Sequence, residues 1–250
     1  DIYLLTELDR GNKRTGNVDM FERIKQALGM SGYFSLEFLE HDSLWRSIIR
    51  QGGPGGGSHG NAVFSRFPMD SYRVLALPTN EALRWDGSTI IPELFEPRTG
   101  QRNAQLFELS FDQTTITFVN THIENWRNNW AHRRAQLSSA LAERRGQELV
   151  IAGDFNPLGG ILKTIGRWRS VNKEVKDLRQ FLAAQGLSDP FSNEDYTTFS
   201  WGARAKLDWI AMSNGLKVLS QVNLRTPLSD HNCLVVELEI VQCTVREGRS

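Results

Sequence analysis

The sequence predicts an α/β (α+β) protein built from mostly antiparallel sheets that helices cover. Strand patterns outnumber helical ones, the helical segments are scattered between hairpins and single strands, and the regular βαβ alternation of a doubly wound sheet is missing. The 250 residues are 40% hydrophobic and 23% charged, a composition typical of globular proteins. A disordered chain or a collagen-like fibre is therefore not expected.

In the first half of the chain, residues 2–5 form a short apolar run, which predicts a buried strand ending at Thr6 and Glu7. Asn17 is placed to cap a helix that Gly29 would end. Further along, the pattern predicts these segments: a glycine-rich loop at 52–57, a strand at 61–65, and a hairpin of 104–111 and 115–120 that turns at Asp112-Gln113.

In the second half, residues 129–145 have the apolar spacing of a helix, and residues 149–152 form another buried strand. Asn172 is placed to cap a helix that ends at Gly186. Residues 207–212, 218–224 and 233–240 are predicted to be the last strands. No linker or repeat divides the chain, so one domain is expected over 1–240, with a tail at 241–250.

Charge and cysteine content exclude several classes of protein. The 29 basic residues balance the 29 acidic ones, so no general attraction to nucleic acid or membranes is expected, although a local patch could provide one. The two cysteines predict no disulfide framework, and no apolar run reaches the roughly 18 residues of a membrane span. The chain begins at Asp1 inside an apolar run, which indicates an incomplete N-terminus. The compartment is therefore left open, and the sequence does not indicate an oligomeric state.

Polar residues gather where the predicted strands end. They are Glu7, Thr121-His122, Gly153-Asp154-Phe155-Asn156, Asp208 and Ser229-Asp230-His231. Taken singly, each fits a solvated turn or a packed histidine. Asp208 is harder to explain in this way, because it stands between Leu207 and Trp209 and a partly buried carboxylate needs a partner.

Taken in order, these segments resemble the signature of the endonuclease/exonuclease/phosphatase superfamily. The matching segments are Thr6-Glu7, residues 60–68, 120–123, 153–156, 207–210 and 229–231. Each motif is short, but the ordered set extends over nearly the whole chain. The resemblance implies a four-layer α/β/β/α sandwich with an active site at one edge of its paired sheets. Family members carry an earlier strand ending in an Asn near the site, which would lie before Asp1, so this chain is expected to be impaired.

The resemblance also implies Mg²⁺- or Mn²⁺-dependent hydrolysis of a phosphate ester. Glu7 resembles the principal metal ligand and Asp230 a second one, in keeping with the oxygen ligands that Mg²⁺ prefers. The remaining roles are as follows: Asp154 and Asn156 orient water and contact the phosphate, Asp208 orients the catalytic His231, and His122 donates to a phosphate oxygen. No acidic residue before Gly60 stands out as a support for His122.

The substrate is less well defined. Arg167, Trp168 and Arg169 follow the Asp154 motif and could bind a nucleic-acid backbone and stack on a base, while Asn61 is a further candidate contact. A solvated basic helix face, offset by Glu174 and Asp177, explains the same run. A nuclease or related phosphodiesterase acting on DNA or RNA is the favoured hypothesis. The alternatives are a phosphatase or phospholipase acting on inositol phosphate or sphingomyelin-like esters, and a non-catalytic scaffold.

Overall fold

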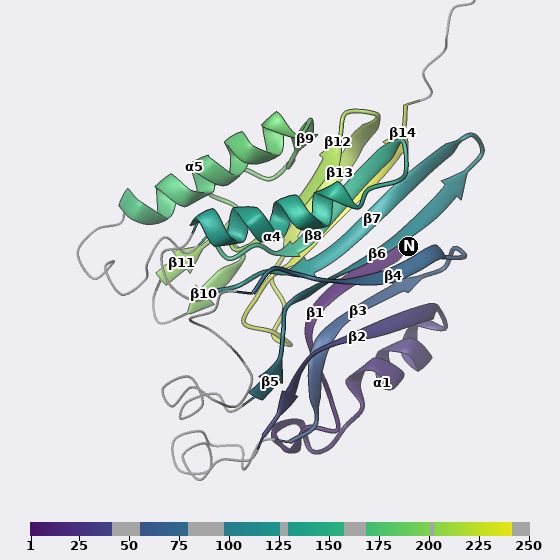
Figure 1. The fold of residues 1–250 in the computed structure, drawn as a ribbon, viewed down its shortest axis with the longest axis vertical. Coiled ribbons are helices and arrows are strands. Elements are labelled where there is room, and N and C mark those ends of the chain that lie inside the picture. Colours follow the sequence, from purple (N-terminus) through teal and green to yellow (C-terminus); the bar gives the residue numbers. More distant parts are fainter. Residues whose placement is uncertain (42–55, 80–97, 126–129, 158–168, 201–202, 242–250) are drawn as a thin grey trace, which may run out of the picture.

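Two β-sheets face each other, and helices cover their outer faces (Figure 1). The computed structural model describes residues 1–41, 56–79, 98–125, 130–157, 169–200 and 203–241. The predicted α/β/β/α arrangement of mostly antiparallel sheets is confirmed. The predicted strand before Asp1 and the division at residue 240 stay predictions.

The larger sheet has six strands in the order β4-β6-β7-β8-β12-β9. These strands are β4 (Asp70–Ala76), β6 (Asn103–Phe111), β7 (Thr114–His122), β8 (Glu148–Asp154), β9 (Leu187–Ser188) and β12 (Asp208–Ser213). Neighbouring strands are antiparallel except for β7 and β8, which run parallel. Because of that one parallel pair, the carboxyl ends of β7 and β8 lie at the same edge of the sheet.

The second sheet has four antiparallel strands in the order β1-β3-β2-β5. These strands are β1 (Ile2–Arg10), β2 (Ser31–Glu40), β3 (Ser58–Ser65) and β5 (Arg98–Gly100). Two further pairs are β10 (Thr198–Ser200) with β11 (Ala203–Ala205), and β13 (Leu216–Leu224) with β14 (Cys233–Ile240). Among the described residues, β1 and β14 each have one partner strand.

The helices are α1 (Met20–Leu28), α4 (Trp130–Ala142) and α5 (Arg169–Ala184), with a short 3-10 helix, η1 (Lys13–Thr15). Alternation along the strands sends side chains to different layers. In β8, Leu149 and Ile151 join the apolar cluster under α4 and α5, whereas Val150 joins the cluster between the sheets. In β3, Phe64 packs against α1 on the other outer face. The four layers follow from this period of two residues.

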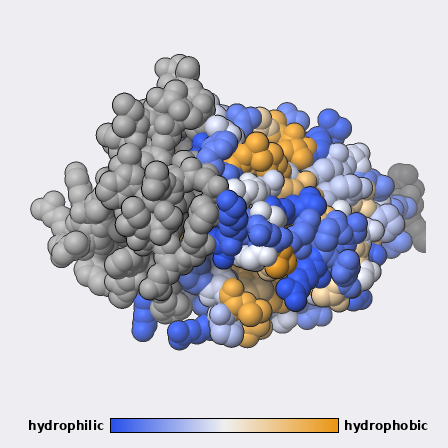
Figure 2. Space-filling view, turned by 90° about the horizontal axis from the view of Figure 1, so that it is seen from below, coloured by the Kyte–Doolittle hydropathy of each residue, from blue (hydrophilic) through white to orange (hydrophobic). Residues whose placement is uncertain are grey.

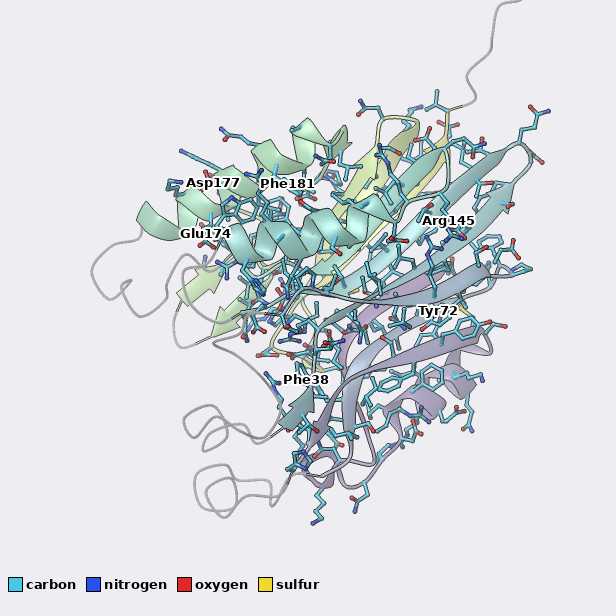
Figure 3. All side chains as sticks on the ribbon, viewed as in Figure 1. Phe38, Tyr72, Arg145, Glu174, Asp177 and Phe181 are labelled. Atoms are coloured by element: carbon cyan, nitrogen blue, oxygen red, sulfur yellow. The ribbon has the colours of Figure 1, made fainter. Side chains whose placement is uncertain are left out.

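Helices α4 and α5 are joined by both charge and packing. Arg133 of α4 donates to Glu174 of α5 at 2.6 Å, and both side chains are almost fully buried. Trp130, one turn before Arg133, meets Phe181, two turns after Glu174, edge to face. Figure 3 shows Glu174 and Phe181 on the side of α5 toward α4. Glu174 is therefore not available to offset a solvated basic face, which is the alternative explanation of the basic run. Asp177 does pair with Lys173, at 2.7 Å.

Several predicted boundaries are wrong, although the elements exist. Asp19, not Asn17, caps α1, while Gly29 ends it as expected. Asn172 lies inside α5, which begins at Arg169. β1 continues past Glu7 to Arg10, because backbone pairing with β3 resumes after a bulge. The predicted hairpin of β6 and β7 is confirmed, and the glycine-rich loop falls mostly outside the described residues.

The described surface mixes hydrophilic and hydrophobic groups. Seen from below, hydrophobic groups are separated by hydrophilic ones on the part of the face that is coloured (Figure 2). Exposed apolar side chains include Leu219, Val222 and Leu224 of β13. Within the described ranges, no helix has the length and apolarity needed to cross a membrane.

The cap of α1 can be tested by substitution. Asp19 accepts the backbone N–H of Glu22 at 3.0 Å and pairs with Arg10 at 2.7 Å. Asp19→Ala should lower the free energy of unfolding by about 1–2 kcal/mol, because the first turn loses its acceptor. Urea denaturation measures the change. Asn17→Gly is the matched control, since Asn17 has a positive φ of 59° that glycine adopts freely. A larger loss at Asn17 than at Asp19 would contradict the assignment.

Candidate active site

Three side chains predicted to be functional lie in one row across the larger sheet. His122 at the end of β7 stands opposite Asp154 at the end of β8, and Asp154 stands opposite Asp208 at the start of β12. The parallel pairing of β7 with β8 and the antiparallel pairing of β8 with β12 bring these three positions to the same edge. The row unites residues that are far apart in the sequence.

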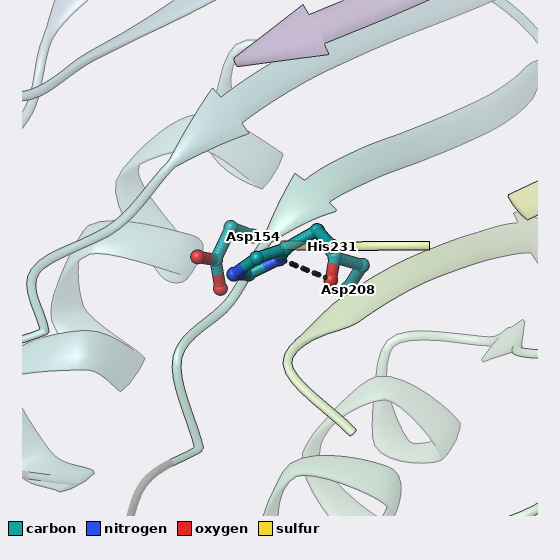
Figure 4. Close-up of side chains that lie close together, drawn as sticks. All are labelled: Asp154, Asp208 and His231. Atoms are coloured by element: carbon teal, nitrogen blue, oxygen red, sulfur yellow. Dashed lines mark hydrogen bonds and ion pairs between the residues drawn. The ribbon is translucent and has the colours of Figure 1, made fainter. Parts of the chain in front are cut away.

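His231 completes this group through a short contact with Asp208. Its Nδ1 lies 2.7 Å from Asp208 Oδ2, and Figure 4 shows the imidazole between the carboxylates of Asp208 and Asp154. Burial disfavours the imidazolium, but the hydrogen bond and charge of Asp208 outweigh it and raise the pKa of His231 to about 9. Because Nδ1 is engaged by Asp208, Nε2 is the ring nitrogen that remains for a substrate.

Asp154 is buried at the centre of the row. Its Oδ1 accepts the backbone N–H of Asn156 at 2.9 Å, and its Oδ2 lies 3.5 Å from His122 Nε2. Burial, and then the charges of Asp208 and Glu7, raise the pKa of Asp154 to about 8. The side chain of Asn156 in turn donates to the carbonyl of Ile123 at 3.1 Å, which fixes the turn after β8.

Glu7 approaches this group from the other sheet. It lies in the β1 bulge with a φ of 60°, a left-handed conformation that is uncommon outside glycine. Its carboxylate is 56% exposed, with Oε1 at 3.6 Å from His122 Nδ1 and 3.9 Å from His59 Nε2. Strained backbone of this kind clusters at functional sites, and here it turns a carboxylate toward two histidines.

His122 is held by an arginine. Arg102 donates to His122 Nδ1 at 2.9 Å and to Glu37 at 2.8 Å, and all three side chains are buried. Burial and the charge of Arg102 lower the pKa of His122 well below its usual range. Since arginine can only donate, Nδ1 must accept and the ring proton must sit on Nε2. An acidic residue before Gly60 therefore does support His122, but it does so through Arg102.

A second buried histidine, His59, lies near Glu7. The sequence indicates no function for it. His59 Nδ1 lies 2.9 Å from Asp9 Oδ1, and Arg14 contacts both Asp9 oxygens at 2.7 Å. Burial would raise the pKa of Asp9, but the hydrogen bonds from His59 and Arg14 lower it to about 2. Asp9 lies two residues after Glu7, but the sequence predicts that the strand ends at Glu7. The sequence therefore does not indicate Asp9, and only the continuation of β1 to Arg10 relates it to the site.

The other predicted residues have varied positions. Asp230 is exposed, and its charge adds to those around His231. Asn61 is fully buried in β3, where it stands opposite Ser35. Arg167 and Trp168 lie outside the described residues, and Arg169 is the first residue of α5. The structure thus brings Glu7, His122, Asp154, Asp208 and His231 together.

The donor groups suit a divalent cation. One ligand atom each from Asp154, Asp208 and His231 lies within 4.8 Å of the other two. Carboxylate oxygens are the ligands that Mg²⁺ and Mn²⁺ favour. The charges of Asp208 and Glu7 both raise the pKa of Asp154, so a cation among these groups would relieve their repulsion. The residues present therefore fit the metal that the sequence resemblance implies.

Residues 56–60, Gly-Gly-Ser-His-Gly, also match the spacing of a serine-hydrolase nucleophile motif. That chemistry requires the serine on a sharp strand-to-helix turn. Ser58 is instead the first residue of β3 and pairs with Arg10 of β1 and Leu39 of β2. The local structure is an extended strand, which does not form a nucleophile elbow.

Comparison with known families agrees with the geometry. A family model described as Endonuclease/Exonuclease/phosphatase family matches residues 1–231. The chain belongs to the endonuclease/exonuclease/phosphatase family. Members of this family are hydrolytic phosphoesterases. No curated protein matches the chain significantly in sequence.

Solved structures share the fold at low sequence identity. An endonuclease/exonuclease/phosphatase from Beutenbergia cavernae has a TM-score of 0.65 and 18% identity, covering 96% of this chain and 62% of that protein. The human Nocturnin catalytic domain with bound sulfate has a TM-score of 0.60 and 21% identity, covering 96% and 81%. D. rerio TDP2 with a single-stranded DNA product has a TM-score of 0.58 and 14% identity, covering 96% and 86%.

The pairing of His231 with Asp208 can be tested by titration. The pKa of His231 is raised to about 9 from an ordinary 6.5, so its ring stays protonated at neutral pH. Asp208→Asn removes the charge and keeps the shape, so the pKa should fall toward 6.5. NMR titration of the ring in EDTA measures the change, with His132 as an internal control. An unchanged His231 titration would contradict the pairing.

Proposed function

We propose that this protein is a Mg²⁺- or Mn²⁺-dependent phosphodiester hydrolase that acts on nucleic acid. The observation that carries the proposal is the row of His122, Asp154 and Asp208, with His231 held against Asp208. Two hydrogen-bonding imidazoles and a buried carboxylate converge on one edge of the sheet. A non-catalytic scaffold needs no such convergence, and burying these groups costs stability.

The metal would be held by carboxylates around this edge. Glu7 and Asp230 are the proposed principal ligands, with Asp154 and Asp208 nearby. When bound, a divalent cation neutralises phosphate oxygens and lowers the pKa of a bound water. The exposed carboxylate of Glu7 faces the site from the opposite sheet, so ligands from both sheets can share the ion.

The protein's own groups divide the remaining work. In its ionised form, which a pKa of about 8 favours at mildly alkaline pH, Asp154 accepts the proton of the attacking water on Oδ2, since Oδ1 is already held by the N–H of Asn156. His122 donates from Nε2 to a phosphate oxygen whose charge grows in the transition state, because Arg102 fixes the proton on that nitrogen. His231 donates from Nε2 to the phosphate or leaving oxygen, while Asp208 fixes its orientation. The amide of Asn156 contacts the phosphate.

Two considerations favour nucleic acid over a small ester. A structure with the same fold, TDP2, is described with a single-stranded DNA product. The basic residues Arg167 and Arg169 with Trp168 directly precede or begin α5, which follows the Asp154 turn in sequence. Arginines that follow a phosphate backbone and a tryptophan that stacks on a base are typical of single-strand binding.

Hydrolysis assays test the activity. The protein should cleave bis-p-nitrophenyl phosphate and a labelled single-stranded DNA with Mg²⁺ or Mn²⁺, and EDTA should stop both reactions. Asp154→Asn and His231→Ala should each lower kcat/KM by about 10²–10⁴-fold, the usual contribution of a positioned acid or base. Asp177→Asn on α5 is the matched control and should leave the rate unchanged. Folded protein with no metal-dependent cleavage of either substrate would refute the proposal.

The choice of substrate has its own test. The double variant Arg167→Ala/Arg169→Ala should lower DNA cleavage by about tenfold or more and weaken its salt dependence, while sparing the small aryl diester. Lys173→Ala, further along α5, is the control, because Lys173 already pairs with Asp177. Equal loss on both substrates would count against nucleic acid.

A further inference from the structure

We propose that Thr197 is a positioning residue that holds Asp208 and His231 in catalytic alignment, because its hydroxyl and carbonyl bind the backbone beside both residues. This inference rests on the proposed function. Asp208 and His231 are 23 residues apart and belong to different segments, yet their side chains meet at 2.7 Å. A separate element must therefore fix one segment relative to the other.

On one side, Thr197 holds the start of β12. Its side chain is fully buried, and Oγ1 accepts the backbone N–H groups of Leu207 and Asp208, each at 3.0 Å. At this end β12 pairs with β8, whereas β9 pairs only with Met212 and Ser213 at the other end. The threonine hydroxyl thus takes the place of a neighbouring strand for these two amides.

On the other side, the same residue holds the segment that carries His231. The carbonyl of Thr197 accepts the N–H of Asn232 at 2.6 Å, directly after the histidine. Thr198 forms an antiparallel bridge with His231, and its Oγ1 donates to the carbonyl of Asp230 at 3.3 Å. The backbone on both sides of His231 is therefore fixed to residues 197–198.

Residues 196–197 are themselves held by hydrogen bonds, so they can fix Asp208 and His231 relative to each other. The N–H of Thr197 donates to the carbonyl of Ala205 at 2.9 Å. The carbonyl of Tyr196 accepts the side-chain amides of Asn223, at 3.0 Å, and Asn232, at 3.2 Å. Removing the hydroxyl would leave the amides of Leu207 and Asp208 without their acceptor, and the start of β12 would shift. Misplacement of a catalytic group by about 1 Å can cost about 10²-fold in rate.

Thr117 provides a matched control at the far end of the sheet. It too is fully buried, and its Oγ1 accepts two backbone N–H groups, from Arg145 at 3.2 Å and Gly146 at 2.8 Å. It lies near the start of β7, whereas His122 ends that strand. Thr117→Val and Thr197→Val make the same chemical change and leave the same kind of amides unpaired. They differ in their distance from the catalytic pair.

The experiment compares these variants on bis-p-nitrophenyl phosphate with saturating Mn²⁺. Thr197→Val should lower kcat by about 10–100-fold with KM nearly unchanged, whereas Thr117→Val should keep the wild-type kcat. Thr197→Ser retains the hydroxyl and should restore most of the rate. In a His231→Ala background, Thr197→Val should cost nothing further, because the residue acts through that histidine. An additive loss in this cycle, or equal kcat values for the two valine variants, would overturn the inference.

A readout independent of turnover separates this inference from the proposed function. The Nδ1 proton of His231, shared with Asp208, should give a protected low-field NMR signal in the wild type and Thr117→Val, and should exchange faster in Thr197→Val. If the wild type cleaves no substrate but shows this pattern, the function fails and the positioning role stands. An unchanged signal in Thr197→Val would overturn the positioning role. If Thr197→Val does not fold, Thr197→Ser is compared with Thr197→Ala instead, because these two variants differ only by the hydroxyl.

Discussion

The pairing register of β7, β8 and β12 is the constraint on which the site depends. His122, Asp154 and Asp208 face one another because each is paired with the next across the sheet, and a slip of one residue would turn every side chain to the opposite face. Gly153 maintains this register. Its φ is +136°, and a Cβ there would lie 1.9 Å from the carbonyl of Thr121. Any larger residue would force β7 and β8 apart immediately before the row.

The arginines that contact His122 and His59 are already paired with carboxylates. Arg102 is bound by Glu37, and Arg14 by Asp9, so neither is free to neutralise the central carboxylates. Asp154 is consequently surrounded by like charge, with His231 as its cationic neighbour. The paired arginines orient histidines, as Arg102 does for His122, while the excess of carboxylate charge at the centre suits a divalent cation.

The sequence predicts the site residues that belong to local motifs. It does not predict those that are defined only by contacts with distant residues. Glu7, His122 and Asp154 each follow an apolar run, and His231 precedes one, in an order that a family shares. Arg102 has no such signal, because its partner Glu37 lies 65 residues away on another strand. The sequence does not distinguish Asn17 from Asp19 as the cap of α1, because both suit an N-cap by type, and only the backbone shows that Asp19 occupies it. Likewise, Glu7 ends an apolar run without ending the strand, because β1 continues to Arg10.

The two sheets must also be fixed relative to each other, and apolar packing alone does not do this precisely. Asn120 lies two residues before His122, and its Nδ2 is within hydrogen-bond distance of the carbonyls of Leu5 and Ala62, at 2.9 and 3.2 Å. Leu5 lies two residues before Glu7. A fully buried amide in an apolar interior tolerates few arrangements, because an unpaired polar group there is costly. Any sliding of one sheet over the other would break these contacts, so Asn120 ties the approach of Glu7 to the position of His122. Asn120 thereby helps to fix the approach of Glu7 Oε1 to His122 Nδ1, two atoms from different sheets that lie 3.6 Å apart.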